Sequence, residues 1–230
     1  MSKIPRLVIG VDPGYATQGM AIISVDPEPR LVKLHVSTTD NEYDQHTRTQ
    51  WQLDRALAVL SPFMSYGRLQ ALLMLEEFHA SAFGRSPPMN AYYRGWYDCM
   101  LRERVASRFE AAVTVHAMHV RLWSGNFQKV PNKKESSSPD ETASFLLNIA
   151  RNLFDGQLVD HLEIDCLGKK QTAKSCVVHA ADSLVMAVMG IAAYVKPEWK
   201  RGRTQKQQEW IQKIHETYPP SSLQEEGGVR

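Results

Sequence analysis

The sequence has few cysteines and no segment typical of export. Its three cysteines, Cys99, Cys166 and Cys176, are odd in number and have no C-x-x-C spacing, which argues against a disulfide framework and a cysteine-based zinc site. The amino terminus has no basic region followed by an apolar core and a cleavage site. We therefore expect the protein to reside in a reducing compartment.

A strong charge excess and a membrane-spanning segment are also missing. The net charge of +2 and the pI of about 8.4 are too mild to indicate a nucleic-acid partner by themselves. One long apolar run, residues 177–195, contains His179 and Asp182. An aspartate in hydrocarbon costs about 2.5 to 3.5 kcal/mol, so this run is interpreted as a buried helix of a soluble protein, with no membrane partner.

The first feature that is present is a predicted hairpin over residues 6–23. A Val/Ile-rich run ends at Asp12, followed by Pro13 and Gly14, and a second apolar run begins at Gly19. A lone carboxylate at the end of a central strand is costly unless it meets a cation, so Asp12 is a candidate metal ligand. The alternative is that Asp-Pro-Gly is only a turn in which the aspartate caps its own backbone.

The next strands extend this hairpin into a sheet. Residues 31–38 predict a third strand and residues 47–62 a helix, after which residues 69–75 form an apolar run that ends in Glu76-Glu77. If the helix is a crossover, this strand lies parallel to the first and brings Glu76 towards Asp12. Residues 111–118 predict a fifth strand, and Glu163 and Asp165 fit either one side of a short strand or a solvated edge.

Residues 90–107 predict a helix with an aromatic and methionine stripe. Such a stripe is most often a core or helix-packing face, and a dimer seam is the alternative. Its members are Met89, Tyr92, Tyr93, Trp96 and Met100.

Two segments are locally basic. Residues 119–138 interleave cations with Trp123 and Phe127, a composition that suits a nucleic-acid backbone with exposed bases, although a solvated loop has the same composition. Residues 197–218 predict a basic helix, with a disordered tail over 219–230. The expected organisation is one domain over residues 1–196 and an extension over residues 197–230.

His179 and Asp182 are three residues apart on the predicted apolar helix and share one face. Ala180 and Ala181 between them permit close packing on the sheet. A single buried histidine is usually a satisfied core residue, but two desolvated polar groups in register indicate a site.

Three motifs, in order, resemble the RuvC family of Holliday junction resolvases in the ribonuclease H-like superfamily. They are G-V-D-P-G at the start, M-L-E-E closing the fourth strand, and H-A-A-D-S-L-V-M-A leading into an alanine-rich helix. The resemblance covers residues 6–194. It implies an α/β fold, with a ribonuclease H-like mixed five-stranded sheet flanked by helices, followed here by the basic helical extension.

The resemblance also implies residue roles. Asp12, Glu76 and Asp182 match the family's metal-binding acids, and Glu76 is favoured over Glu77, which strand alternation sends to the opposite face. His179 stands where many members have aspartate and some have histidine, and imidazole favours softer ions than carboxylate does. The residues expected to contact DNA are Phe78, His79, Arg85, Arg121, Lys129, Lys133 and Lys134.

The implied activity is a metal-dependent endonuclease that cuts four-way junctions, and other branched DNA, by paired incisions from a homodimer. The expected cofactor is Mg²⁺, two ions per active site, with Mn²⁺ able to substitute. The compartment is then the cytoplasm or another reducing one that holds DNA, inside the host cell if the source is viral. The alternatives are a ribonuclease H acting on RNA·DNA hybrids, an actin-like ATPase or sugar kinase, and a junction-binding protein whose chemistry has lapsed.

Overall fold

A single mixed sheet organises the part of the chain that the computed structural model describes, which is residues 6–14, 16–64, 70–76, 88–107, 111–117, 162–168 and 173–196, with Gln205, Glu209, Gln212 and Glu216. The strands are β1 (Leu7–Pro13), β2 (Thr17–Ser24), β3 (Arg30–Thr39), β4 (Gln70–Glu76), β5 (Ala111–Ala117) and β6 (Leu162–Leu167). The helices are α1 (Gln45–Met64), α2 (Pro88–Ala106) and α5 (Ala173–Gly190), which continues into the π-helical segment η3 (Ile191–Val195).

The strand order is β5-β4-β1-β2-β3-β6. β1, β2 and β3 form an antiparallel meander, whereas β4 and β5 lie parallel to β1, as a crossover through α1 requires. The ribonuclease H-like fold class is therefore confirmed, with all five predicted strands present.

A sixth strand, β6, extends the predicted five-stranded sheet. It pairs parallel with β3 and forms an edge of the sheet. Leu162 and Ile164 pack against the core, while Glu163 pairs with Lys33 and Asp165 lies 3.1 Å from His35. Apolar and charged side chains thus alternate between the two faces of β6, as expected for a half-buried edge strand. Of the two interpretations of Glu163 and Asp165, the short strand describes the segment, and it lies at the sheet edge.

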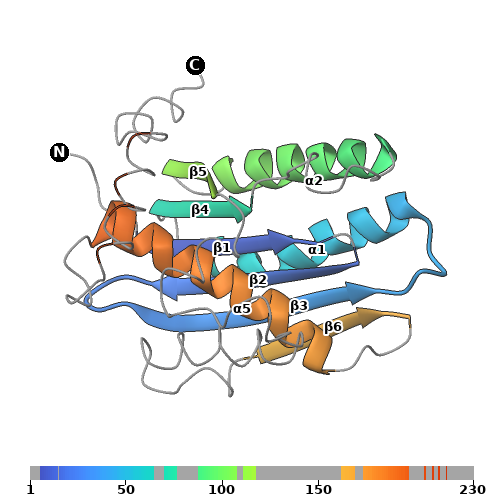
Figure 1. Ribbon diagram of the computed structural model, residues 1–230, viewed down its shortest axis with the longest axis horizontal. Helices are drawn as coiled ribbons and strands as arrows, with labels where there is room; N and C mark the ends of the chain where they lie inside the picture. Colours follow the sequence, from blue (N-terminus) through green and yellow to red (C-terminus); the bar gives the residue numbers. More distant parts are fainter. Residues whose placement is uncertain are drawn as a thin grey trace.

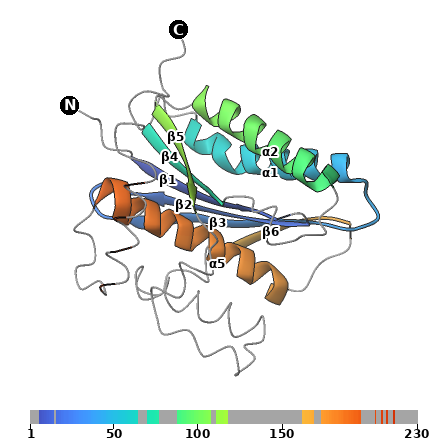
Figure 2. The same cartoon turned by 45° about the horizontal axis from the view of Figure 1, so that its top comes forward.

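Helices cover both faces of the sheet, with α1 and α2 on one side and α5 on the other (Figure 1, Figure 2). Under α1 and α2 the core contains Ile9, Met20 and Leu73, and α2 contributes Tyr97 and Leu101 to it. The core face of α2 therefore differs from the predicted stripe. Of the stripe, Trp96 and Met100 are partly buried and pack against the core, whereas Tyr93 lies beside His46 of α1 and Tyr92 is 63% exposed.

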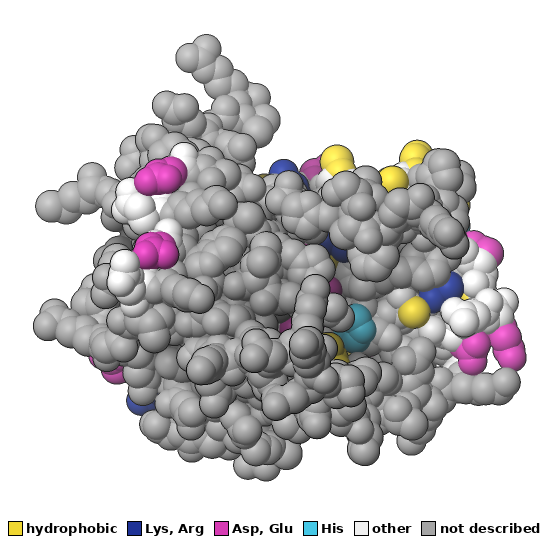
Figure 3. Space-filling view, viewed as in Figure 1, with side chains coloured by type: hydrophobic (Ala, Val, Ile, Leu, Met, Phe, Trp, Pro, Cys, Tyr) yellow, Lys and Arg dark blue, Asp and Glu magenta, His cyan; other side chains and the backbone are white. Residues whose placement is uncertain are grey.

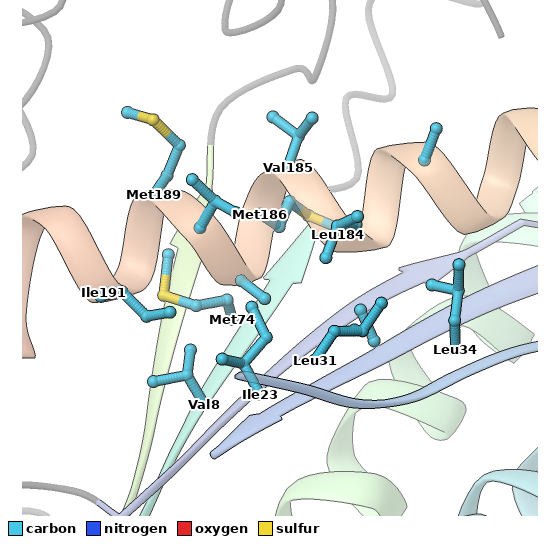
Figure 4. Packing of buried hydrophobic residues seen from close by; sticks show 14 of the residues in the cluster. Val8, Ile23, Leu31, Leu34, Met74, Leu184, Val185, Met186, Met189 and Ile191 are labelled. Carbon is cyan, nitrogen blue, oxygen red and sulfur yellow. The ribbon is translucent and has the colours of Figure 1, made fainter. Parts of the chain in front are cut away.

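The opposite core lies under α5. Figure 4 shows Val8, Ile23 and Met74 of the sheet directed at this helix, which contributes Leu184 and Met186. The run Cys176–Val195 is long and apolar enough to cross a membrane, but 78% of its most apolar stretch is buried inside the molecule. It is therefore a buried core helix, as the presence of His179 and Asp182 in the apolar run predicted.

Two glycines allow α5 to lie directly on the central strands. A Cβ on Gly10 would be 1.9 Å from the carbonyl oxygen of Ser183, and one on Gly19 would be 1.9 Å from that of His179. Only the absence of a side chain permits this approach. The backbone of α5 at His179 is thereby held against β2, next to the end of β1.

Of the predicted carboxyl-terminal extension, the structure describes Gln205, Glu209, Gln212 and Glu216. All four are exposed helical positions, with i,i+4 hydrogen bonds from Gln205 to Glu209 and from Gln212 to Glu216. The division at residue 196 stays a prediction.

Candidate active site

The candidate site lies where β1 and β4 end side by side. Val11 is opposite Leu75 in the parallel register, so the next residues, Asp12 and Glu76, emerge together at the carboxyl edge of the sheet. Side chains two residues apart on a strand point to the same face of the sheet. Asp12 therefore shares a face with Gly10, and Glu76 with Met74, and both of these residues lie under α5. His179 and Asp182 lie on adjacent turns of α5.

The side chain of Asp12 connects this cluster. Its Oδ2 lies 2.6 Å from Nδ1 of His179, and it also shares a hydrogen bond with the carboxyl group of Glu76. Asp12 is 4% exposed, whereas the side chain of His179 is 32% exposed. The Asp-Pro-Gly turn is closed by the backbone instead, with Gly14 N–H donating to the carbonyl of Asp12 at 3.0 Å. The self-capping alternative does not describe this turn.

Crowding of acids perturbs the protonation of the cluster. Burial, the charges of Asp12 and Asp182, and the hydrogen bond to Asp12 raise the pKa of Glu76 to about 9. Burial also works against ionisation of Asp12, but the hydrogen bond and charge of His179 and the hydrogen bond of Glu76 hold the pKa of Asp12 below its usual range. Burial likewise opposes the charged form of His179, yet the partnership with Asp12 and the charge of Asp182 raise its pKa.

The donor set suits a hard cation. Three carboxylates and one imidazole act on one another here, and burial together with the neighbouring carboxylates disfavours ionisation of Glu76. In the described part of the chain, no three His, Cys, Asp or Glu side chains already surround an ion position.

Arg94 of α2 holds the two strand ends from the side opposite α5. Its Nη1 donates to the carbonyl oxygen of Pro13 and its Nη2 to that of Glu76, each at 2.5 Å, while Nε donates to Asp98 at 2.9 Å. Its charge also favours ionisation of Asp12 and Glu76.

Sequence reasoning missed Arg94. Its only local signal is the Arg-x-x-x-Asp spacing, which is the ordinary pattern of an exposed helix ion pair. Its partners Pro13 and Glu76 are 81 and 18 residues away in the chain, and nothing in the pattern of α2 points to them.

Several predicted residues lie outside the described part of the chain. They are Glu77, which was the alternative to Glu76, and all of the expected DNA contacts: Phe78, His79, Arg85, Arg121, Lys129, Lys133 and Lys134. Their roles stay predictions.

No family model and no curated protein matches the sequence. Among solved structures, the chain is similar to Thermus thermophilus RuvC, at 15% identity and a TM-score of 0.48, over 79% of this chain and 91% of that one. It is similar at the same identity and TM-score to T. thermophilus RuvC in complex with a Holliday junction substrate, over 93% and 97% of the two chains. It is also similar to the yeast mitochondrial Holliday junction resolvase, at 14% identity and a TM-score of 0.44, over 97% and 86%.

The sheet order, the helices on its two faces and the cluster at the ends of β1 and β4 are observations on this chain alone. By these features, the chain has a ribonuclease H-like fold.

Proposed function

We propose that this protein is a metal-dependent endonuclease that resolves Holliday junctions and cuts related branched DNA. The observation that carries the proposal is the convergence of Asp12, Glu76, His179 and Asp182, from three distant parts of the chain, at one edge of a ribonuclease H-like sheet. The branched-DNA substrate rests on the three sequence motifs that resemble the RuvC family.

In this proposal the four side chains provide ligands for Mg²⁺. Asp12 is the central ligand, because it is buried, favours its ionised form and touches the neighbours on both sides. Glu76 and Asp182 supply further carboxylate oxygens, which Mg²⁺ prefers, and Glu76 gives up its proton as the ion binds. Two such ions would supply the hydroxide nucleophile and stabilise the leaving 3′ oxygen, which leaves a 5′ phosphate.

His179 has two roles in the same proposal. Its hydrogen bond to Asp12 favours the charged form of the imidazole while the site is free of metal, and its partial exposure leaves the ring accessible from the sheet edge. In the loaded site the neutral ring is a ligand, which predicts that Mn²⁺ supports activity as well as Mg²⁺.

Paired incision of a two-fold symmetric junction calls for two such sites, so we propose that the protein acts as a homodimer. The exposed aromatic part of α2 is the candidate contact surface. It consists of the exposed Tyr92 and the half-buried Tyr93, whose rings meet edge to face at 5.3 Å. Figure 3 shows hydrophobic side chains exposed along the edge of the molecule where α2 lies.

The proposal is tested with labelled four-way junction, flap and RNA·DNA hybrid substrates, each incubated with Mg²⁺ or Mn²⁺. We expect symmetric incisions in the junction, and a loss of at least about 10²-fold in cleavage rate for Asp12→Asn, because a central charged group is removed from the site. Asp54→Asn is the matched control, since Asp54 is an exposed carboxylate on α1 that bonds only to Gln50 in the same helix.

Other outcomes identify the alternatives. Preferred cleavage of the hybrid would make the protein a ribonuclease H. Tight junction binding with no cleavage in either metal would make it a binding protein whose chemistry has lapsed. Nucleotide binding measured by calorimetry would favour an ATPase or kinase of related fold.

A further inference from the structure

The guanidinium of Arg94 is the only described side chain that bridges the main chains of both acid-bearing strands. It donates to the carbonyl of Pro13, one residue after Asp12, and to the carbonyl of Glu76 itself. Its side chain is 13% exposed and that of Asp98 is 15% exposed, so this network is largely shielded from water. Such contacts differ from those of an ordinary helix ion pair at the surface.

Each nitrogen of the guanidinium has a separate partner. Nη1 and Nη2 reach the two strand ends, and Nε is held by Asp98. A planar fork with fixed donor directions sets the separation of the two carbonyls, which a single flexible ammonium group cannot do.

The separation of these strand ends matters because each carries one carboxylate. β1 and β4 are held together by their ladder only as far as Val11 and Leu75. Beyond that point the carboxylates of Asp12 and Glu76 repel each other when both are ionised, and Arg94 is the fixed positive charge beside both.

We propose that Arg94 is a positioning residue for the metal site. Its guanidinium fork fixes the spacing of the strand ends that carry Asp12 and Glu76, and Asp98 orients the fork. In this role Arg94 acts through the main chain of the two strand ends, to which its guanidinium donates, and not as a ligand. The inference rests on the proposed function only in taking these acids as metal ligands.

The test measures Mn²⁺ affinity of the full chain by calorimetry, well below the melting temperature of each variant. Arg94→Lys keeps the charge but loses the fork, and we expect it to weaken Mn²⁺ binding by about 10- to 100-fold, the usual effect of losing a group that orients a metal ligand. Arg94→Met is expected to lose at least as much, and Asp98→Asn less than Arg94→Lys. The matched controls are Arg104→Lys and Arg104→Met, which alter an exposed arginine near the end of the same helix.

Wild-type affinity in Arg94→Lys would overturn the inference, even if the variant melts at a lower temperature, because a purely structural role changes stability alone. A second measurement separates the inference from the proposed function. If the wild type binds no Mn²⁺, the proposed function fails. The NMR signals of the His179 imidazole in the metal-free chain then decide the inference: they shift in Arg94→Lys and not in Arg104→Lys if it is right, and stay unchanged if it is wrong.

Discussion

At the scale of single residues, the folded protein disfavours the ionised form of Glu76. The side chain is buried and lies close to the carboxylates of Asp12 and Asp182, so the folded chain holds a proton on it that the unfolded chain releases. A cation that binds Glu76, as proposed, has to displace this proton. In the proposal, proton uptake and metal binding are therefore opposed at this position.

This opposition predicts how stability depends on pH in the absence of divalent ions. The pKa of Glu76 rises from 4.5 to about 9 on folding, so the free energy of unfolding falls as pH rises between these values. The pKa of His179 rises above 6.5 on folding, so its contribution is complete below pH 6.5 and is lost as pH rises through the folded value. The pKa of Asp12 is lowered from 3.8 on folding, so its stabilising contribution is complete above pH 3.8 and is lost as pH falls through the folded value. It therefore does not change between pH 5 and pH 9.

The measurement is thermal unfolding followed by circular dichroism between about pH 5 and pH 9, with and without Mg²⁺. Without Mg²⁺ the melting temperature should fall across this range, and Glu76→Gln should flatten the fall because it carries no titrating proton. Mg²⁺ should stabilise the wild type most at the alkaline end, where its ligands are already deprotonated. A melting temperature that rises with pH in the metal-free chain would contradict the account of Glu76.

At the level of elements, the contact between α5 and the central strands determines where His179 and Asp182 lie. The helix rests on Gly10 and Gly19 without intervening side chains. Its two polar residues are therefore held at the sheet edge by the same contact that builds the core.

Substituting one of these glycines tests the contact. In Gly19→Ala the new methyl group meets the carbonyl of His179, so the helix must move outward. We expect a loss of about 1 to 3 kcal/mol in the free energy of unfolding, typical of overpacking, and a fall in cleavage rate greater than the lost stability explains. Urea denaturation gives the first quantity and the junction assay the second.

Gly95 of α2 provides the matched control. A Cβ there would meet nothing within 4 Å, so Gly95→Ala should be neutral or should stabilise the helix by about 0.5 to 1 kcal/mol. If Gly19→Ala behaves in the same way as Gly95→Ala, α5 does not depend on close approach to β2.

The elements also show how far the sequence could predict the structure. The strands around Asp12 and Glu76 and the helix of His179 were predictable, because each has a strong local period of hydrophobic residues. The core face of α2 was not predictable from the sequence. Tyr92, Tyr93 and Trp96 match a helical stripe as well as Tyr97 and Leu101 do, and only the position of α1 decides which of these side chains is buried.

The same distinction applies to the site. Asp12, Glu76, His179 and Asp182 could be proposed together, because each is a polar interruption of an apolar element whose register places it at one sheet edge. The contacts of Arg94 are long-range in sequence and involve main-chain carbonyls, which leave no mark on side-chain patterns. Close approach of α5 at Gly10 and Gly19 is likewise visible only once the layers are packed.

On the scale of the whole molecule, both layers of helices return from the same edge of the sheet. β1, β3, β4 and β6 are mutually parallel, so their carboxyl ends share this edge with the candidate site, and α1, α2 and α5 each follow a strand that ends there (Figure 1). The amino-terminal turns of α1 and α2 therefore lie near the site, and His46 meets Tyr93 and Trp96 between them. A second copy that docked on this part of α2 would place two sites in one particle.

This arrangement predicts a dimer that depends on Tyr92. Tyr92 is 63% exposed and has Tyr93 beside it, so Tyr92→Glu places a charge in the proposed contact without touching either core. Light scattering coupled to size exclusion should give the mass of two chains for the wild type and of one chain for Tyr92→Glu.

Tyr43→Glu, at an exposed tyrosine before α1, controls for the added charge and should remain a dimer. Since each site lies within one chain, the monomeric variant should still nick junctions, but the two incisions should become uncoupled in time. A wild type that is monomeric at all concentrations and still cuts both strands together would refute the dimer.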